Sequence, residues 1–578
     1  MQPAKKESGA GKGSFRQAQA WLHTWCGLWF SWLLYAVFLT GTLAVFEEPI
    51  THWMTPEHHA HEQAEARQEG TVPQAQSSLS QRLQWGMAYM QRQHPGADMW
   101  ELWPADSKGG GDLRVYWFDH EGQYAAAQLD PKSGSAMDAA DVPKVRQTLG
   151  GHHFVDFHYQ LHAGQLGLWV VGIAALAMLV ALASGVITHR RIFKDFFTFR
   201  ARKGQRSWLD MHNAVAVLTL PFQLMIAYTG IAISCATFMP AGIAAYFGSS
   251  AEAVKSFQVA LNEPGKPQRS GQSMPVPDLE SFVLRGQALI GQPVRAVVID
   301  YPGDAVARIG IYGWNEADDL SKRLSPSSGM AMFSAATGEL QQLRLPGGVD
   351  GGVASLTQSV IGGLHMATYG GLPLKWLYFI CGLAGSAMMA TGAILFMVKR
   401  RGRHQGEFGS STSTVYRMIE AANVAAIVGL GIACVGFLWA NRLLPVEISQ
   451  RSRWELVVFF ALWILALIHA LLRSPPLAWR DQMAALAVLC LLLPLLNLVT
   501  TGEQLAAYLL DGDWESAGVE LFALAVGVAA AGAWAWMRKA SGLKPVRKQM
   551  ARELSARELS KDLPAAADAS AAKQGSLS

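Results

Sequence analysis

The chain has 578 residues, of which 51% are hydrophobic and only 16% are charged. This balance excludes an ordinary soluble enzyme and predicts an α-helical polytopic membrane protein. The formal net charge of +4 collects in short basic segments beside apolar runs, so it gives no reason to expect a nucleic-acid partner. The five cysteines lie in or beside apolar runs without CxxC spacing, which argues against a disulfide framework and against a zinc or iron–sulfur site.

The N-terminal part predicts a tail, a span and a polar module. A basic tail over residues 1–20 precedes an apolar run over residues 21–46. The run is too long for a signal-peptide core and has no small-residue cleavage site, so we expect an uncleaved span whose N-terminus is cytoplasmic. Residues 47–153 follow, with a helical stretch, SLSQRLQWGMAYMQRQHPG, and then DLRVYWFDHEGQYAAAQLD, which predicts two strands around a turn at residues 120–122. We expect a small periplasmic α+β module.

Residues 154–239 predict a transmembrane hairpin, because two long apolar runs flank a basic loop. Basic residues are concentrated in cytoplasmic loops, so the turn of this hairpin should lie inside. The basic residues of the loop are Arg190, Arg191, Lys194, Arg200, Arg202, Lys203 and Arg206.

A second polar segment, residues 240–358, repeats the order of the first. PDLESFVLRGQALIG predicts a helix, and PVRAVVIDYP, AVARIGIYGW and GMAMFSAATGELQQL predict strands. We therefore expect a second α+β module on the periplasmic side. A fourth span over residues 359–403 follows and ends in basic residues.

Four additional apolar runs occupy residues 415–540, which makes about eight spans and returns the C-terminus to the cytoplasm. The Ala/Ser/Lys/Glu composition of residues 541–578 predicts a cytoplasmic tail that is disordered or, beyond about residue 550, a loose helix. Three arginines oppose this topology because they fall on a predicted outer loop. They are Arg442, Arg451 and Arg453.

Histidines stand at the ends of the first four spans, at two depths. His23 and His212 begin spans that run outward, so their imidazoles should share the cytoplasmic depth. His158, His162 and His365 begin spans that run inward, so they should share the periplasmic depth. An intramembrane ionisable residue is a functional candidate, although a single histidine also serves as an interhelical hydrogen-bonding group.

Imidazoles that face each other across a helical bundle are typical axial ligands of a b-type haem. Two depths predict two such haems. The sequence has no CxxCH, which excludes covalent c-type attachment, and it lacks carboxylates and thiolates at matching depth, which disfavours zinc. Small residues near the histidines leave room for a macrocycle. They are Gly27, Gly41, Gly164, Gly167, Gly185, Gly230, Gly362, Gly363, Gly382 and Gly385.

Three stretches carry a resemblance to a known family. They are WLHTWCGLWFSWLLYAVFLTGTL, the hairpin that begins FHYQLHAGQLGLW and continues through GQRSWLDMHNAVAVLTLPFQ, and LHMATYGGLPLKWLYFICGLAGSAMMATGAILF. Together they resemble the PepSY-associated transmembrane (PepSY-TM) family over roughly residues 15–403. The likeness extends to its dihaem inner-membrane ferric-siderophore reductases, and both polar segments resemble PepSY modules. The four C-terminal spans depart from the shorter members.

The resemblance implies His23 and His212 as ligands of an inner haem, and His365 with one histidine of the FHYQLH motif as ligands of an outer haem. The second outer ligand stays open between His158 and His162. His158 is favoured because it stands where simpler relatives have their single histidine, nine residues before a shared glycine. The two residues are one helical turn apart, so we also expect them to share one helix face.

Other histidines have weaker claims to a ligand role. His189 ends the second span beside two arginines, which favours an interfacial position, and His152 and His153 read as surface residues. A cluster after the first span is interpreted as a solvated linker, with metal binding as the alternative. Its members are His52, Glu57, His58, His59, His61 and Glu62.

The leading functional interpretation is an oxidoreductase of the bacterial inner membrane that reduces ferric siderophore, Fe(III) to Fe(II), in the periplasm. A cytoplasmic or quinol donor would supply the electrons, because no GxGxxG motif follows a cytoplasmic strand. No catalytic residue is expected beyond the haem ligands. One alternative is a non-catalytic membrane-anchored PepSY binding or regulatory protein. Another is a transporter, which is disfavoured because the spans lack the paired carboxylates and broken-helix signals expected near the midplane.

Overall fold

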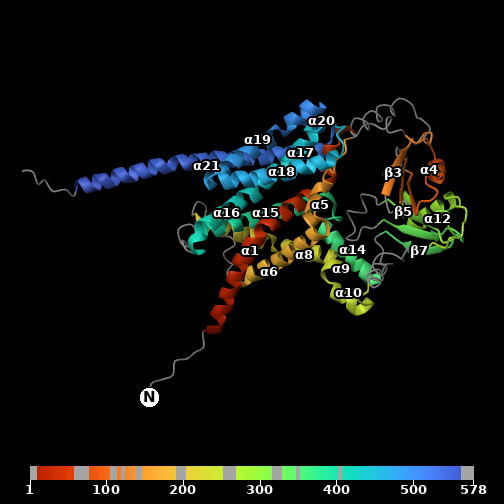
Figure 1. Ribbon diagram of the computed structural model, residues 1–578, viewed down its shortest axis with the longest axis horizontal. Coiled ribbons are helices and arrows are strands. Elements are labelled where there is room, and N and C mark those ends of the chain that lie inside the picture. The colour runs from red at the N-terminus through yellow and green to blue at the C-terminus, as the bar shows by residue number, and fades with distance from the viewer. Residues whose placement is uncertain are drawn as a thin grey trace, which may run out of the picture. The chain divides into compact units, whose positions relative to one another are not determined.

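The computed structural model describes residues 10–57, 77–104, 113–118, 124–130, 132–137, 146–189, 204–250, 269–314, 328–346, 352–400 and 407–561. The chain separates into two units (Figure 1). Unit 1 is Met1–Glu407 with Leu444–Ser452, and unit 2 is Phe408–Leu443 with Arg453–Ser578. Unit 1 contains a helical bundle and a β-sheet domain, whereas the described part of unit 2 is helical.

Four long helices of unit 1 pack in a ring, with α1 against α6, α6 against α8, α8 against α15 and α15 against α1. Small residues allow the close approach: a Cβ on Gly382 would meet the Thr42 hydroxyl, and a Cβ on Gly385 would meet the Phe38 ring. The ring is a four-helix bundle, in which facing helices present side chains to one core. The bounds are Ala10–Ala44 (α1), Gly164–Thr188 (α6), Gln205–Ile233 (α8) and Gly371–Arg400 (α15).

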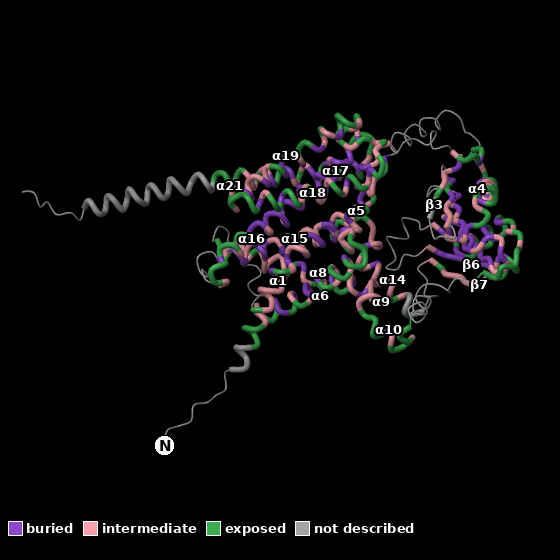
Figure 2. The backbone as a smooth tube through the Cα atoms, viewed as in Figure 1, coloured by how far each residue is buried: buried purple, intermediate pink, exposed green. Residues whose placement is uncertain are grey.

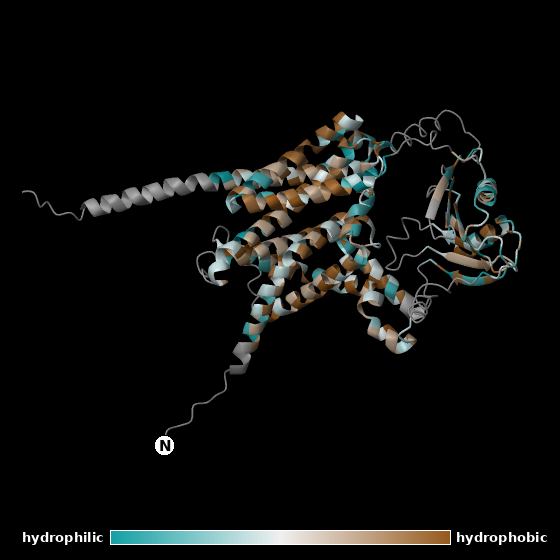
Figure 3. Cartoon of the chain, viewed as in Figure 1, coloured by the Kyte–Doolittle hydropathy of each residue, from teal (hydrophilic) through white to brown (hydrophobic). Residues whose placement is uncertain are grey.

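Large apolar side chains cover the outward faces of these helices. Leu166 and Leu218 are each 71% exposed, and Ile173 is 54% exposed. Figure 2 shows green, exposed positions along the long helices, and Figure 3 shows that brown, hydrophobic ribbon is concentrated there. Exposure of such apolar surfaces to water is unfavourable, whereas their contact with the hydrocarbon of a membrane is favourable.

Eight helices in the described part of the chain are long and apolar enough to cross a membrane, which agrees with the predicted number. The protein is therefore a multi-pass membrane protein. The candidate spans are Phe15–Ala44, Gly164–Thr188, Gln205–Ile233, Gly371–Arg400, Gly409–Leu443, Arg451–Leu472, Pro475–Thr501 and Trp514–Lys539.

Two histidines that we expected at span ends lie instead on separate short helices. His158 belongs to α5 (His152–Gln160), which packs against α1 and α6, and His365 belongs to α14 (Gly352–Met366), which packs against α8. Left-handed residues, including Ala367 and several glycines, break the chain before each span begins. Further short helices of this unit are α2 (Glu47–Met54), α9 (Cys235–Phe238) and α10 (Pro240–Phe247).

Both predicted α+β modules are present, and they share one β-sheet. Seven strands form an antiparallel sheet in the order β3-β2-β1-β4-β5-β6-β7, so the orange and green strands of Figure 1 lie side by side. The modules join where β1 pairs with β4, from Met99 opposite Asp300 to Leu102 opposite Val297. The elements are α4 (Leu79–Gln93), β1 (Met99–Trp103), β2 (Leu113–Phe118), β3 (Tyr124–Leu129), α12 (Glu280–Ile290), β4 (Val294–Asp300), β5 (Arg308–Gly313), β6 (Met330–Ser334) and β7 (Leu340–Arg344).

The core of this domain lies between one face of the sheet and the helices α4 and α12. Alternate strand residues such as Leu102, Val297 and Ile309 are fully buried in one hydrophobic cluster with residues of both helices. Strand β1 was not among the predicted strands, although its Met-Trp-Glu-Leu-Trp sequence alternates. The predicted turn at residues 120–122 lies outside the described residues.

Unit 2 is built around α19, which packs against α16, α17 and α21. A π-helical turn over Ala425–Gly429 interrupts the first span of this unit, and Trp463 donates a hydrogen bond of 3.0 Å to the carbonyl of Ala425. The bounds are η1 (Gly409–Ser411), α16 (Thr412–Val424), α17 (Leu430–Leu443), α18 (Arg451–Leu472), α19 (Pro475–Thr501), α20 (Leu505–Asp511) and α21 (Trp514–Lys561). Helix α21 continues to Lys561, so the helical alternative holds for this part of the tail, whose Ala/Arg/Glu/Lys-rich sequence favours continued helix.

A buried polar network joins the helices of unit 2. Arg442 donates to Asn497 Oδ1 at 2.7 Å and to Asn441 Oδ1 at 2.6 Å. Asn441 donates to Glu455 at 2.9 Å, and Asn497 donates to Glu520 at 2.8 Å. All five side chains are at most 5% exposed. Arg442 is therefore an internal partner rather than an outer-loop charge, and Glu455 and Glu520 each bond to a different asparagine.

Candidate functional site

Two histidine rings meet in the core of the four-helix bundle. His23 stands on α1 and His212 on α8, helices that occupy diagonal positions in the ring. Their ring centroids are 6.4 Å apart and their planes are inclined by 63°. The structure thus brings together the two residues that the sequence places at the inner depth. We call them the inner pair.

A second pair of rings meets at the other end of the bundle. His158 of α5 and His365 of α14 have ring centroids 5.9 Å apart and planes inclined by 36°. Burial lowers the pKa of both imidazoles. Both rings are therefore neutral, which is the form that coordinates a metal. We call them the outer pair.

Each of the four rings packs against a glycine on a neighbouring helix. The atom nearest to a Cβ built on Gly41 is His158 Nδ1, at 2.5 Å. Cβ atoms on the other three glycines would approach Cε1 of the remaining rings at 3.0–3.2 Å. No larger residue fits in these places without moving the imidazole. The further pairs are Gly185 with His23, Gly230 with His365, and Gly392 with His212.

The Nδ1 atom of each ring is held by the same neighbouring helix. His23 Nδ1 lies 2.8 Å from the carbonyl oxygen of Ala181, and His158 Nδ1 lies 2.8 Å from that of Val37. His212 Nδ1 lies 3.1 Å from the carbonyl oxygen of Met388. In all three cases the acceptor precedes the contacted glycine by one helical turn.

The fourth ring also bonds to the backbone one turn before its glycine, and it contacts a threonine hydroxyl as well. His365 bonds to the backbone of Ile226, one turn before Gly230, and its Nδ1 lies 3.0 Å from Thr229 Oγ1. A carbonyl acceptor requires the proton on Nδ1, so it leaves Nε2 with a free lone pair. Among the described residues, none forms a hydrogen bond with Nε2 of these four histidines.

The ring separations match those of two imidazoles that share one metal. A metal–imidazole bond of about 2.0 Å, with the ring centre about 1.1 Å behind the nitrogen, places two opposed ring centres about 6.2 Å apart. The observed separations are 6.4 and 5.9 Å. The donor set, the free Nε2 atoms and the absence of large side chains at the glycines all fit bis-imidazole ligation of haem.

Both diagonal helices carry the same spacing between the two ends. His23 and Gly41 of α1 are 18 positions apart, and so are His212 and Gly230 of α8. Eighteen residues are about five helical turns and about 27 Å, so each histidine and its distant glycine lie on one face of the helix. That distance is close to the thickness of a hydrocarbon core. One face of each helix therefore serves both pairs, at opposite ends.

The second histidine of the FHYQLH motif takes a different position. Because α5 ends at Gln160, His162 does not share a helix face with His158, and the expectation that it would is wrong. His162 has a left-handed backbone, and its Nε2 lies 2.9 Å from Nδ1 of His153, with the two rings stacked. His153 is itself fully buried, so the expectation that it is a surface residue is also wrong.

His189 lies close to the inner pair. It caps the end of α6, and its ring centroid is 6.4 Å from that of His23. Three imidazoles therefore gather at this end of the bundle, and His212 is the one that faces His23 from the diagonal helix. Sequence position alone did not reveal this neighbour.

The other candidate metal cluster is only partly described. His58, His59, His61 and Glu62 lie outside the described residues, whereas Glu57 accepts a hydrogen bond of 2.8 Å from Arg146. Within the part of the chain that the structure describes, no group of three or more His, Cys, Asp or Glu side chains is arranged to hold a metal ion. His152 is engaged with Glu47, at 2.7 Å between Nδ1 and Oε1.

Comparisons with known proteins show the family to which this chain belongs. A helical bundle with paired histidines and a PepSY-like sheet domain defines a class of multi-pass membrane protein, and the chain belongs to the PepSY-associated TM region family, which matches residues 20–399. It is also 24% identical over 414 residues to an uncharacterized protein of Pseudomonas aeruginosa, an alignment that covers 68% of this chain and 97% of the relative. The match to the family ends before unit 2 begins.

Proposed function

We propose that this protein binds two b-type haems non-covalently and acts as a transmembrane oxidoreductase that reduces ferric siderophore at the periplasmic face. His23 and His212 would hold the inner haem, and His158 and His365 the outer haem. His162 is the weaker candidate for the outer site because it pairs with His153. Haem, when bound, supplies one-electron redox chemistry.

The observation that carries this proposal is the fourfold repetition of one arrangement. Each histidine lies on a glycine of a neighbouring helix and bonds to the backbone one turn before that glycine, and three of the four do so through Nδ1. Among the described residues, none bonds to the Nε2 atoms. Structural histidines in a bundle need no such uniformity. Ligands need it, because the bond from Nδ1 to the backbone carbonyl sets the tautomer and orients the ring before a metal binds to Nε2.

The bundle residues also support a haem environment of low polarity. Leu34, Met178, Leu182 and Met388 are almost completely buried between the two pairs, in the core of the bundle. Such a lining excludes water from the ligand nitrogens and strengthens the electrostatic effect of the fixed carbonyl acceptors.

The distribution of basic residues supports a reaction on the periplasmic side. The basic residues of the sequence collect at loops and tails on one side of the first four spans, which we assign to the cytoplasm of a bacterial inner membrane. Both termini then lie inside and the sheet domain lies outside. A large polar chelate is accommodated only outside, where reduction weakens the hold of the chelate on iron and releases Fe(II). The donor on the inner side is a cytoplasmic or quinol reductant.

A redox spectrum tests the proposal directly. Full-length protein purified from cells with ample haem should show reduced-minus-oxidised b-type bands, and pyridine haemochrome analysis should give two haems per chain. A colourless protein, or a stoichiometry well below two, would instead favour a PepSY binding or regulatory protein whose histidines are structural.

A further inference from the structure

One fully buried glutamine stands between the two histidine pairs, in the core of the four-helix bundle. Gln223 lies on α8 and is 0% exposed. Ala227, one turn further along the same face of α8, belongs to the apolar cluster that α1, α6 and α15 also supply. An amide in such a core has lost its hydration, so both of its ends are normally hydrogen-bonded to protein.

Gln223 shares one face of α8 with the residues that serve both pairs. It follows His212 by 11 positions and precedes Gly230 by seven. At 3.6 residues per turn, both separations return to within about 20° of the same direction. Along the helix axis they correspond to about 16 Å to His212 and about 11 Å to Gly230, against which the His365 ring packs. The glutamine is therefore aligned with both pairs and lies nearer to the outer pair.

A hydrogen-bond chain along α8 fixes the orientation of this amide. The hydroxyl of Thr219, one turn before Gln223, donates to the carbonyl oxygen of Val215 at 2.8 Å. The hydroxyl proton is thus already used, and the hydroxyl oxygen accepts from Nε2 of Gln223. Because the amide nitrogen is held toward the inner end of the helix, the amide oxygen is turned away from that end.

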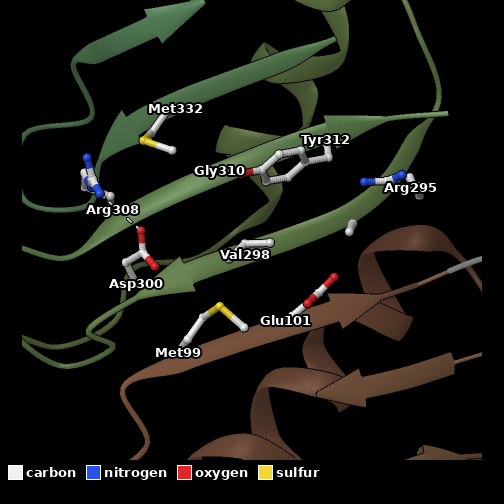
Figure 4. Close-up of a pocket in the computed structure, with 10 residues that line it drawn as sticks. Met99, Glu101, Arg295, Val298, Asp300, Arg308, Gly310, Tyr312 and Met332 are labelled. Carbon is white, nitrogen blue, oxygen red and sulfur yellow. Dashed lines mark hydrogen bonds and ion pairs between the residues drawn. The ribbon is translucent and has the colours of Figure 1, made fainter. Parts of the chain in front are cut away.

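The amide oxygen of Gln223 has no hydrogen-bond partner among the described residues. By contrast, the buried Arg308 of the sheet domain donates to Asp300 at 3.3 Å, in the pocket that Figure 4 shows. A buried acceptor without a donor is costly, and in native proteins it calls for an explanation such as a redox or catalytic role. Here it leaves the negative end of the amide dipole uncompensated in a core of low polarity.

An uncompensated oxygen favours positive charge in its neighbourhood. With two neutral imidazole ligands, a ferric haem carries one more positive charge than a ferrous haem. The negative end of a fixed dipole therefore stabilises the oxidised form and lowers the reduction potential. The effect is strengthened by the low dielectric constant of the core and decreases with distance, so it should be larger at the outer site than at the inner site.

We propose that Gln223 acts as a fixed dipole that lowers the reduction potential of the outer haem and so makes this haem a stronger reductant. Thr219 holds the amide in the orientation that has this effect. The assignment rests on the proposed function for the presence of the two haems, and it does not depend on which acceptor takes the electrons.

Spectroelectrochemical titration of the haem-loaded full-length protein tests this assignment. Gln223→Met keeps the length of the side chain and removes the amide. The equilibrium constant for reduction of the outer haem should rise roughly twofold to fivefold, which corresponds to a potential about 20–40 mV higher, and the inner haem should shift less. Repeating the titration in a His212→Ala background, which is expected to retain only the outer haem, assigns the shifted potential to that site.

Thr219→Val is a second variant, which leaves Gln223 in place and removes the group that holds its nitrogen. It should raise the potential of the outer haem in the same direction, because the amide is then able to turn. Ser386→Ala is the matched control, since this buried hydroxyl of α15 donates to the carbonyl oxygen of Gly382 at 3.0 Å. Both potentials should stay unchanged in the control.

An unchanged or lower potential of the outer haem in Gln223→Met overturns the assignment, as does an equal shift in Ser386→Ala. A wild-type protein without haem rejects the proposed function and this assignment together. If ferric siderophore fails to reoxidise the reduced wild type while the Gln223→Met shift is present, the reductase is rejected and the role of Gln223 stands.

Discussion

At the residue scale, the four paired histidines share one local environment, and the glycines are as much a part of it as the imidazoles. Gly41, Gly185 and Gly230 were among the small residues expected to leave room near the histidines, whereas Gly392 was not. Their role is more specific than giving room for a macrocycle. Each one lets an imidazole approach a helix closely enough to bond to its backbone.

Gly41→Ala tests this role with the smallest possible change. The new methyl group would stand 2.5 Å from His158 Nδ1, so the ring must shift and lose its bond to Val37. We expect the outer haem to fall well below full occupancy, although alanine raises helix propensity by about 1 kcal/mol. Gly27→Ala on the same helix is the control, since nothing lies within 4 Å of a Cβ there. Haem content measured by pyridine haemochrome should fall only in the first variant, and an unchanged content would reject the role.

His212→Ala is expected to remove one haem of two. The inner pair then lacks its diagonal member, while the outer pair, about 27 Å away along α8, is untouched. The retained haem should show an unaltered low-temperature α-band. His189→Ala should keep both haems, because its ring contacts His23 from the end of α6 rather than from the diagonal helix. Loss of both haems from well-folded His212→Ala protein would show that the pairing is wrong.

At the scale of elements, chain breaks decide which side chains meet. Helix α5 stops at Gln160, and the left-handed residues that follow turn His162 away from the bundle core and toward His153. A continuous helix would have put His158 and His162 on one face. Likewise, the two modules are far apart in the sequence. Strand β1 joins them because the edge that does not pair with β2 pairs with β4.

Single substitutions in the FHYQLH motif should therefore separate the two histidines. We expect His158→Ala to abolish the outer haem, since it removes the ring that faces His365 at 5.9 Å. His162→Ala should retain the outer haem and lower stability modestly through loss of the stacked partner of His153. The spectrum of each purified variant distinguishes these outcomes, and the reverse result would assign the ligand to His162.

The shared sheet predicts that the two modules unfold as one body. Leu102 of β1 is fully buried between them, and Leu102→Ala should cost about 2–5 kcal/mol by the cavity that it leaves. Amide hydrogen exchange should then accelerate in β4 as well as in β2. An exposed strand substitution, Arg114→Ala, serves as control. Faster exchange confined to β1–β3 would mean that the modules are energetically independent.

At the scale of the whole molecule, the chain combines a unit that matches the family with a second, helical unit beyond the match. The family match ends at residue 399, and unit 2 has its own core and its own buried Arg442–Asn497–Glu520 network. Breaking one member of such a network is costly because it leaves buried charge unpaired. The paired histidines lie entirely in unit 1, so the proposed haem binding would belong to that unit.

His365→Ala tests the direction of the whole route. The variant should lose the outer haem and keep the inner one, and it should still be reduced by the inner donor or by dithionite. Ferric siderophore added to the outer face of proteoliposomes should then reoxidise it at least tenfold more slowly than wild type. A normal rate in protein shown to lack the outer haem would contradict the proposed inner-to-outer route.

The sequence by itself determined the membrane class, the number of spans, the two α+β modules and the pairing of His23 with His212. These features depend on composition and on local periodicity, which a linear pattern records directly. Only the tertiary structure decided that His158 rather than His162 meets His365, that the modules share a sheet through β1 and β4, and that Arg442 is buried among amides. Those outcomes depend on where helices break and on which strand edges, distant in the sequence, pair with each other. Both are determined by the free energy of long-range packing rather than by local sequence pattern.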